Sequence, residues 1–331
     1  SYFDGTVGQT ISEGIVSFML VDAYGIPVSG VPVTWTPSGG TRIVASDSVT
    51  DRYGIAAAQP LLGATPDNSF IMAWAGGRIL TFSGYARLSP TILQDGVVNA
   101  ASFESGSPVA PGSYVAIFGS GLSETTEAAA TARLPLAIDY SIVSFDVPGA
   151  GISVPGHLTY VSPGQVNVQV PWELQGQSSA QVKVAVSFSN GNVVTVPLAD
   201  YAPAFFETVP SSGTVLGVAA ALDHNNAVVT TSTQATRGQL VQLFVNGLGP
   251  VTNQPASGDP APLSPLSETI ARPVVTIGGR EAAVGFSGLT PTLAGLYQIN
   301  VTIPTDLEPG THPVTIAIGG KTSKSSGLPV K

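Results

Sequence analysis

Residues 111–122 read P-G-S-Y-V-A-I-F-G-S-G-L, and residues 237–248 read R-G-Q-L-V-Q-L-F-V-N-G-L. Five positions are identical at a constant offset of 126 residues, namely Gly112/Gly238, Val115/Val241, Phe118/Phe244, Gly121/Gly247 and Leu122/Leu248. Further along, Gln165-Val-Asn-Val-Gln-Val-Pro171 recurs as Gln298-Ile-Asn-Val-Thr-Ile-Pro304 at an offset of 133. A repeated supersecondary unit indicates a string of modules, and such strings hold, space or bind more often than they catalyse.

The composition is that of a β-rich chain with many turns. Glycine (38) and proline (27) are frequent among the 331 residues, and 43% of the residues are hydrophobic, enough apolar surface to offset the entropy lost on ordering. This combination predicts short buried strands joined by Gly/Pro turns. The length alone allows about two domains, or three if each is a β-sandwich of roughly 100 residues.

Charge and cysteine content exclude several classes of partner and site. A net charge of −9 with only 12 Lys and Arg argues against nucleic-acid binding, which needs clustered basic side chains. The chain contains no cysteine, which excludes disulfides, thiolate metal sites and a cysteine nucleophile. No apolar run approaches the length of about 18 residues that a membrane-spanning helix needs, so we expect no membrane insertion.

Residues 1–88 predict an all-β domain of about seven strands. Two Asp-x-x-Gly segments, at 22–25 and 51–54, and the Gly76-Gly77 pair are turn signals. The strands that we expect here are residues 15–21, 31–36, 55–58, 69–75 and 79–82.

These turn and strand residues also resemble a known family. Val21-Asp22-x-x-Gly25-x-Pro27-Val28-x-Gly30-Val31-x-Val33-Thr34-Trp35, followed by Thr50-Asp51-x-x-Gly54-x-Ala56, resembles the bacterial immunoglobulin-like domain of invasin and intimin type. The resemblance covers nearly all of residues 1–88. It implies a β-sandwich in which the motif marks turns and strand starts rather than a binding site.

The remaining sequence divides at the repeat into residues 89–203 and 204–331. The segment 124–133 is compatible with one or two helical turns or with a long loop, and Asn190-Gly191 predicts a two-residue hairpin turn. Gly278-Gly279 is a second turn signal. We expect strands at residues 114–118, 141–145, 158–161, 166–170, 182–188, 193–198, 241–245, 274–277, 297–303 and 313–318.

Two further resemblances cover residues 90–330. The pattern Gly-x-x-Val-x-Ile/Leu-Phe-x-x-Gly-Leu, followed by a strand that ends in Val/Ile-Pro, resembles the IPT/TIG immunoglobulin-like fold. A longer ordered set resembles the Solibacter-type C-terminal domain, a family found at the C-termini of predicted secreted acidobacterial proteins: Asn99-Ala-Ala-Ser-Phe103, Ala110-Pro-Gly-Ser113, Tyr160-Val-Ser-Pro-Gly-Gln165-Val-Asn167-Val-Gln-Val-Pro-Trp172-Glu173, Gly247-Leu-Gly-Pro250 and Gly295-Leu-Tyr-Gln298-Ile-Asn300-Val. This second resemblance implies architecture and an exported location, and no activity.

Catalytic residue patterns are missing from the sequence. No Gly-x-Ser-x-Gly elbow occurs, and the three histidines, His157, His224 and His312, lie far apart without a local carboxylate pattern. We therefore predict a chain that is not an enzyme and binds no cofactor. A hydrolase site at a domain junction stays as a third hypothesis, because a Ser/His/carboxylate triad is assembled in space; it requires a histidine within hydrogen-bond reach of both a serine and a carboxylate.

Metal sites are also not expected, although three aspartates are calcium candidates. Asp22, Asp51 and Asp223 each occupy a turn, the last within Asp223-His-Asn-Asn226. Calcium prefers clustered oxygen ligands and can stiffen junctions between sandwiches. No Asp-x-Asp-x-Asp-Gly run is present, and Asp at a turn more often caps its own backbone.

Three tryptophans bear on carbohydrate binding, because sugar faces stack on exposed aromatic rings. Trp35 and Trp74 lie in apolar strand patterns and are predicted core residues. Trp172 follows Pro171 at a strand end and is the ligand-binding candidate, although we favour a position at the junction between residues 89–203 and 204–331. The repeated pairs Gln165/Asn167 and Gln298/Asn300 favour a structural role, such as bonds to the backbone of a neighbouring loop, over a duplicated ligand site.

The sequence thus predicts an all-β chain of three tandem immunoglobulin-like β-sandwiches, at 1–88, 89–203 and 204–331. We expect an extracellular or cell-surface location, because the chain begins at Ser1 with no signal peptide and fits a mature exported chain. The expected function is a non-enzymatic structural or adhesive module, monomeric within a longer chain, that spaces, presents or docks a surface or secreted protein. Its partner is a cell-surface protein or glycan. The alternative is a carbohydrate-binding module accessory to a secreted polysaccharide-active enzyme.

Overall fold

The computed structural model describes residues 2–11, 16–187, 189–209, 212 and 215–331. The chain forms two compact units. Unit 1 contains residues 1–89 together with 187–190, and unit 2 contains residues 90–186 and 191–331. The described residues form β-strands and two single-turn 3-10 helices, η1 (Pro148–Ala150) and η2 (Trp172–Leu174). The predicted all-β class is therefore confirmed.

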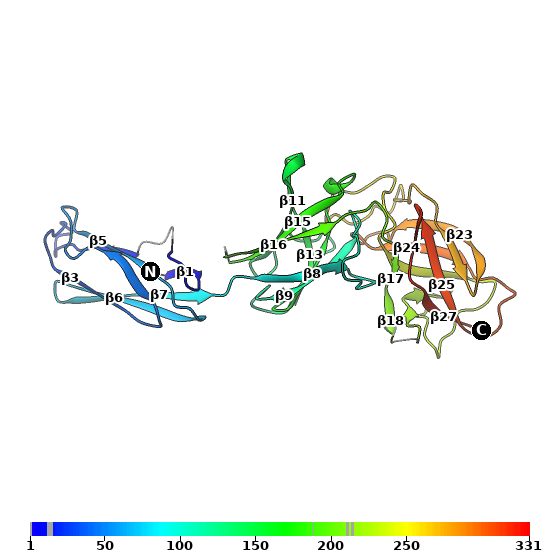
Figure 1. The fold of residues 1–331 in the computed structure, drawn as a ribbon, viewed down its shortest axis with the longest axis horizontal. Coiled ribbons are helices and arrows are strands. Elements are labelled where there is room, and N and C mark those ends of the chain that lie inside the picture. Colours follow the sequence, from blue (N-terminus) through cyan, green and yellow to red (C-terminus); the bar gives the residue numbers. More distant parts are fainter. Residues whose placement is uncertain (1, 12–15, 188, 210–211, 213–214) are drawn as a thin grey trace. The chain divides into compact units, whose positions relative to one another are not determined.

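Unit 1 is a β-sandwich of two sheets around one core (Figure 1). The core alternates inward along β6, where Ile71, Ala73 and Ala75 are buried. The strand order of the larger sheet is β1 (Tyr2–Thr6), β7 (Arg78–Arg87), β6 (Asp67–Ala75) and β3 (Val33–Pro37), and that of the smaller sheet is β2 (Val16–Met19), β5 (Ile55–Leu61) and β4 (Arg42–Ser46).

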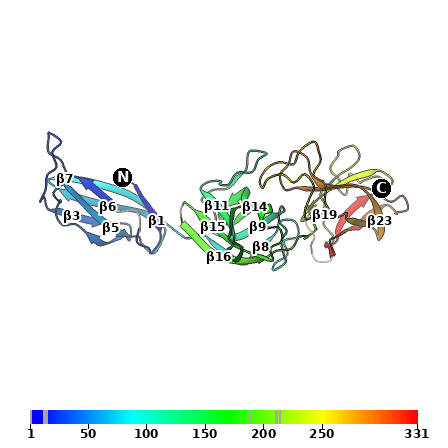
Figure 2. The same ribbon diagram turned by 90° about the horizontal axis from the view of Figure 1, so that it is seen from above.

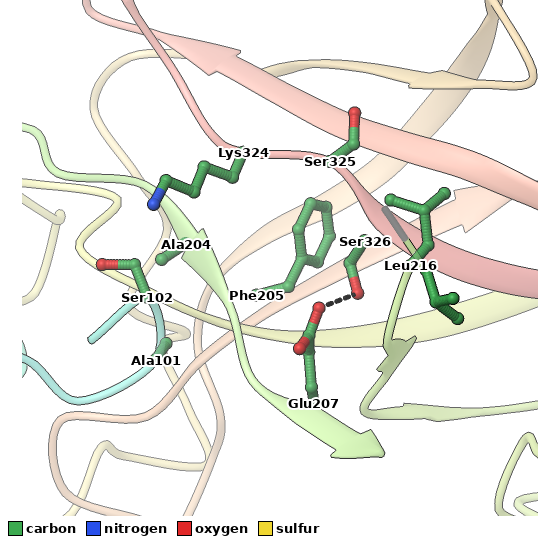
Figure 3. A pocket seen from close by; sticks show the side chains of 10 residues that line it. Ala101, Ser102, Ala204, Phe205, Glu207, Leu216, Lys324, Ser325 and Ser326 are labelled. Carbon is green, nitrogen blue, oxygen red and sulfur yellow. Dashed lines mark hydrogen bonds between the residues drawn. The ribbon is translucent and has the colours of Figure 1, made fainter. Parts of the chain in front are cut away.

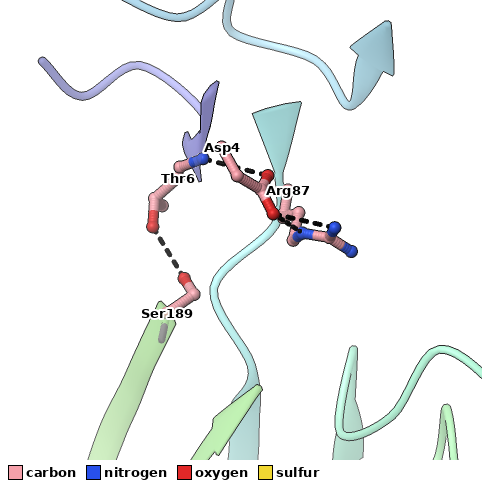
Figure 4. Close-up of polar contacts among 5 residues, drawn as sticks. Asp4, Thr6, Arg87 and Ser189 are labelled. Atoms are coloured by element: carbon pink, nitrogen blue, oxygen red, sulfur yellow. Dashed lines mark hydrogen bonds and ion pairs between the residues drawn. The ribbon is translucent and has the colours of Figure 1, made fainter. Parts of the chain in front are cut away.

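The predicted strands of unit 1 are present, with small shifts at their ends. The Gly76-Gly77 hairpin is confirmed, because both glycines have positive φ between β6 and β7. Ile15, the first residue of the predicted strand 15–21, lies outside the described residues. The sequence pattern predicts neither β4 nor β1. Strand β1 runs parallel to β7, and the Asp4 carboxylate binds the Arg87 guanidinium at 2.8 Å (Figure 4).

Unit 2 contains two sandwich-like halves, each with its own hydrophobic core. We call the first half copy 1. One of its sheets has the order β10 (Glu127–Ala128), β13 (His157–Ser162), β14 (Gln165–Gln169), β9 (Tyr114–Ser120) and β8 (Thr91–Asn99). The facing sheet has the order β12 (Ile152–Pro155), β11 (Ser141–Val147), β15 (Ser179–Val186) and β16 (Ser189–Pro197).

The second half, copy 2, is one continuous sheet wrapped around its core (Figure 2). The long strand β23 (Arg280–Leu289) joins the two faces, because one end pairs with β22 and the other with β24. The sheet order is β17 (Ala204–Phe205), β21 (Leu240–Asn246), β24 (Tyr297–Thr302), β23, β22 (Val274–Ile277), β25 (Gly310–Ile318), β27 (Ser326–Val330), β19 (Val218–Ala219) and β18 (Glu207–Val209). Two short strands flank this path: β20 (Ala221–Leu222) pairs with β21, and β26 (Lys321–Thr322) pairs with β25.

The repeated sequences are neighbouring antiparallel strands in both copies. In copy 1, Gln165 of β14 faces Phe118 of β9. In copy 2, Gln298 of β24 faces Phe244 of β21. The register of the two paired strands is therefore the same in both copies. The first repeat has an offset of 126 residues and the second an offset of 133, because the chain between the paired strands is longer in copy 2.

Two local predictions for copy 1 concern the segment 124–133 and the Asn190-Gly191 turn. The segment 124–133, left open between helix and loop, is a loop that contains only the short strand β10. The predicted Asn190-Gly191 turn is wrong, because both residues lie inside β16 (Ser189–Pro197). Residue 188, the last of the predicted strand 182–188, lies outside the described residues. Gly191 is instead required for close approach, because a Cβ there would lie 2.5 Å from the carbonyl oxygen of Pro90.

Candidate functional site: the junction between the two copies

The segment that follows β14 contributes side chains to two hydrophobic cores. Val170 and Leu174 are buried in the core of copy 1. Trp172, on the single turn of η2 between them, is 4% exposed and belongs to the core cluster of copy 2. One short segment therefore contributes buried side chains to both cores.

A loop of copy 2, residues 254–259, meets this segment, and we call it the docking loop. The backbone N–H of Trp172 donates to Ser257 Oγ at 2.9 Å, and Ser257 Oγ donates in turn to the carboxylate of Glu173 at 2.7 Å. At the outer end of the loop, Gln175 Nε2 donates to Gln254 Oε1 at 2.9 Å. The docking loop is thus held by side chain and backbone of η2.

Gly258 brings the backbone of the docking loop into close contact with copy 1. Its N–H donates to Gln169 Oε1 at 2.7 Å, and its carbonyl oxygen accepts from the N–H of Leu134 at 2.9 Å. The residue has a φ of 80°, and a Cβ would overlap the imidazole of His157. Both polar groups of this peptide are therefore used by copy 1, and the ring of His157 occupies the place of a side chain.

A second contact joins the end of β21 to the start of β9. Asn246, fully buried, accepts from the N–H of Tyr114 at 2.9 Å and donates to the carbonyl oxygen of Tyr114 at 2.8 Å. The same amide donates to Asn99 Oδ1 at 2.9 Å. The phenol of Tyr114 donates to the carbonyl oxygen of Ala294, and burial raises the pKa of Tyr114 to about 12. This contact is fully hydrogen-bonded, as buried polar groups must be to avoid a net cost.

Charged groups ring the docking loop. Arg133 binds Asp259 at 2.8 Å across the rim; the arginine is largely exposed and the aspartate partly exposed, so this ion pair contributes little to stability. His157 lies between Glu173, Asp259 and Arg133, and burial is the largest cause of its lowered pKa. Its Nδ1 is buried without a hydrogen-bond partner among the described residues. The neutral imidazole is therefore the form that fits the junction.

The Gln/Asn pairs of the repeat form the same contact in both copies. Gln165 Nε2 donates to Asn167 Oδ1 at 2.8 Å, and Gln298 Nε2 donates to Asn300 Oδ1 at 2.7 Å. These bonds connect side chains two residues apart on one strand face, rather than a side chain and a loop backbone as expected.

The three calcium candidates adopt one and the same turn. In Asp22, Asp51 and Asp223, Oδ1 accepts two backbone N–H groups, those of the second and fourth residues that follow, at 2.8–2.9 Å. The bond from Ala227 is the largest cause of a lowered pKa at Asp223. The described part of the chain contains no group of three His, Cys, Asp or Glu residues that could hold a metal ion. The geometry is that of a backbone cap.

The histidines do not assemble the triad that the hydrolase hypothesis requires. His224 Nε2 contacts Asn225, and His312 Nε2 contacts the carbonyl oxygen of Glu308. Ser257 and Glu173 lie near His157, but within the described residues neither shares a hydrogen bond with its ring. The hypothesis therefore receives no support from this junction.

The two other tryptophans differ in burial. Trp35 packs against the core of unit 1, as predicted, with its ring 6.2 Å from that of Phe82. The prediction for Trp74 is wrong, because its side chain is 48% exposed. Along β6 the alanines at positions 73 and 75 face the core, so the period of two turns Trp74 to solvent. The apolar run predicts burial of Trp74, but the small side chains on either side of it, and not the large ring, fill this part of the core.

No protein-family model and no curated protein matches the sequence. Among solved structures, one match is the C-terminal 282-residue fragment of intimin in complex with the intimin-binding domain of its translocated receptor, with 17% identity, 55% of this chain covered and a TM-score of 0.33. The alignment spans 56% of that fragment, just over half of its length.

Two further matches cover more of the chain. The SGBP-B protein of the Bacteroides ovatus mixed-linkage glucan utilization locus, in complex with a mixed-linkage heptasaccharide, has 15% identity, covers 96% of this chain and 64% of its own, and has a TM-score of 0.30. A three-domain I-band fragment of titin has 10% identity, covers 100% and 95%, and has a TM-score of 0.27. The fold of tandem immunoglobulin-like sandwiches rests on the strand pairing. Among the described residues, no helix is long and apolar enough to cross a membrane.

Substituting Gly258→Ala should destabilise the chain more than Gly279→Ala. Both glycines have positive φ, so each substitution costs about 1–2 kcal/mol of unfolding free energy from the left-handed backbone alone. Only Gly258 also meets a ring, and overpacking adds about 1–3 kcal/mol. Urea denaturation of both variants measures the difference; equal losses would show that the contact with His157 does not hold the junction.

The stability of the junction should fall in mild acid because of His157. Its pKa in the folded chain is below the ordinary 6.5, so the unfolded chain binds more protons between the two values. The contribution of His157 is therefore complete above about pH 6.5 and is lost as the pH falls toward the folded pKa. Unfolding free energies measured from pH 5 to 8 should show a steeper loss in the native chain than in His157→Gln. Identical slopes would contradict this.

Proposed function

We propose that this chain is a non-enzymatic extracellular module that spaces, presents or docks a surface or secreted protein. The observation that carries the proposal is the junction in unit 2, where Trp172, Asn246 and Gly258 join two sandwiches through buried contacts. Two separate points of attachment, the docking loop and the end of β21, oppose a hinge between the copies. A pair of sandwiches with a fixed geometry suits a spacer better than it suits a flexible linker.

The surface composition supports the same proposal. With only 12 Lys and Arg and a net charge of −9, the chain does not suit a nucleic-acid surface, which is consistent with a module that binds a protein or a glycan. We also propose the finer assignments: domain boundaries at 88/89 and 203/204, from the repeat and the strand pattern, copies of IPT/TIG and Solibacter type, from the resemblances, and a monomeric module within a longer chain. Its partner would be a cell-surface protein or a glycan.

Spin-label distances test the rigid junction. The chain contains no cysteine, so Ile142→Cys in copy 1 and Val274→Cys in copy 2, both exposed positions, give a uniquely labelled pair. We expect one narrow distance distribution by pulsed electron paramagnetic resonance. Gly258→Ala should broaden it and Gly279→Ala should not. A broad distribution in the otherwise unsubstituted chain would rule out a fixed spacer.

Carbohydrate binding is the second candidate function, and the exposure of Trp74 favours it. Phe70, Met72 and Trp74 alternate along the solvent face of β6, about 7 Å apart from one to the next. Ile79 of β7 and Thr34 of β3 lie directly opposite Trp74 on either side. The result is a flat apolar strip with a hydroxyl at its margin, the kind of surface on which sugar rings stack.

Retention on insoluble polysaccharides tests this candidate. If the strip binds glycan, Trp74→Ala should lower the retained fraction at least tenfold, because one stacked aromatic ring is lost. Tyr140→Ala, an exposed aromatic ring in unit 2, is the matched control and should leave retention unchanged. Equal retention of both variants would remove the strip as a binding surface.

A further inference from the structure

A cavity of about 410 Å³ lies beside the seam where copy 1 meets copy 2, and its charged groups are bound within the protein (Figure 3). The Glu207 carboxylate accepts a hydrogen bond from Ser326 Oγ at 2.7 Å. The Lys324 ammonium group is paired with Glu104 at 3.5 Å. These charged side chains therefore bond to the protein itself, whereas side chains open to a ligand lie on the outer face of unit 1.

The solvent face of the larger sheet of unit 1 extends over three neighbouring strands, β3, β6 and β7 (Figure 1). Paired residues of neighbouring strands share a face, so the register arranges their side chains in rows. We call this surface the platform. Its first two rows are Thr34–Trp74–Ile79 and Thr36–Met72–Thr81, and Phe70 continues the β6 column beyond them.

The apolar part of the platform runs along β6. Phe70 and Trp74 are both exposed and lie about 13 Å apart, because four residues of a strand at about 3.3 Å each separate them. Met72 lies between them on the same face. Neighbouring strands are rotated by about 20–25° relative to each other. A straight ligand therefore makes its longest contact along β6, and not across the sheet.

Hydroxyl groups flank this apolar column on both sides. Thr34 and Thr36 are exposed on β3, and Thr81 is exposed on β7. The register places each of them directly beside Trp74 or Met72. A threonine hydroxyl both donates and accepts hydrogen bonds, as a sugar hydroxyl does. The platform thus combines carbon surface in its centre with neutral polar groups at its margins.

The platform residues carry no charge, and this selects the class of ligand. Asp4 and Arg87, farther along the same sheet, are bound to each other at 2.8 Å. A polysaccharide with carboxylate or sulfate groups would bring charges against apolar surface without a counter-charge, which is costly. A neutral sugar chain can place its C–H groups on the rings and its hydroxyls on the threonines. The platform therefore favours a neutral glycan.

The physical state of the glycan follows from the open shape of the platform. It is the face of a sheet, and the cavities of about 410 and 180 Å³ both lie in unit 2. A sheet face contacts a ligand from one side only. A flexible soluble chain must also lose conformational freedom to lie along β6, whereas a chain at the surface of an insoluble polysaccharide is already ordered. The platform therefore favours the ordered ligand.

We propose that the platform binds the ordered surface of a neutral insoluble polysaccharide, with one sugar chain lying along β6 over Phe70, Met72 and Trp74 and its hydroxyls on the flanking threonines. This inference rests on carbohydrate binding, the second candidate function. It adds the charge of the glycan, its physical state and the direction of the bound chain. The spacer role does not depend on it.

Retention of the full chain on a set of solids tests the class of glycan. The neutral solids are microcrystalline cellulose, insoluble mannan, insoluble xylan and chitin, and cross-linked polygalacturonate is the acidic comparison. We expect retention on at least one neutral solid and none on polygalacturonate. Phe70→Ala should lower the partition coefficient about threefold to tenfold, because one aromatic contact is lost. Thr81→Glu should lower it about tenfold or more, because a carboxylate is brought against the ligand without a counter-charge.

Matched variants separate these effects from general damage. Thr81→Gln, similar in size to the glutamate variant but uncharged, should lose less retention than Thr81→Glu. Tyr24→Ala removes an exposed aromatic ring of unit 1 outside the platform and should bind like the native chain. Urea midpoints close to that of the native chain will show that lost retention is not caused by unfolding.

Competition by a soluble oligosaccharide of the same linkage tests the requirement for order. At millimolar concentration it should release only a minor part of the retained protein. Complete release, or retention on polygalacturonate alone, would overturn the inference and leave carbohydrate binding by Trp74 in place. Native retention in both Phe70→Ala and Thr81→Glu, with loss in Trp74→Ala, would do the same. Equal retention of Trp74→Ala and the native chain, or no retention on any solid, would remove the candidate function and the inference together.

Discussion

The approach of the Gly258 backbone to the ring of His157 is the constraint on which the architecture of unit 2 depends. At this distance a side chain has no room, and both polar groups of the peptide are hydrogen-bonded by copy 1. With the docking loop so placed, Ser257 reaches the backbone of Trp172, and the indole enters the core of copy 2. The buried amide of Asn246 then fixes the other end of the seam, so that two sandwiches become one compact unit.

The same backbone hydrogen bond occurs in both copies, but the side chains beside it differ. The N–H of Gly112 donates to the carbonyl oxygen of Val170, and that of Gly238 donates to Ile303, both at 2.8 Å. A Cβ on Gly112 would overlap the indole of Trp172, whereas the equivalent neighbour of Gly238 is the methyl group of Thr305 at 3.2 Å. The duplication therefore preserved the strand pair and varied the side chains at its end. In copy 1, the large buried ring of Trp172 lies at this end and packs in the core of copy 2.

Polar groups in this chain are used mostly for local and inter-strand bonding. The aspartates at the three turns accept their own backbone, and the Gln/Asn pairs of the repeat bond to each other. Such groups do not signal a ligand even though their residue types would suit one. The group that points to recognition is instead the aromatic ring that strand alternation turns to solvent, at Trp74.

The sequence by itself determined the all-β class, most of the strands, the turns at Gly76-Gly77 and Gly278-Gly279, and the duplication. These depend on local periodicity, on glycine at positive φ and on repeated residues. Tertiary structure decided which face of β6 is covered, that Asn190 and Gly191 lie inside β16, and that the docking loop meets η2. Each of these depends on contacts between residues distant in sequence: the alanines that leave Trp74 outside, the Pro90 carbonyl against Gly191, and Gln169 against Gly258. No periodicity encodes such contacts, because they arise only when two folded elements pack together.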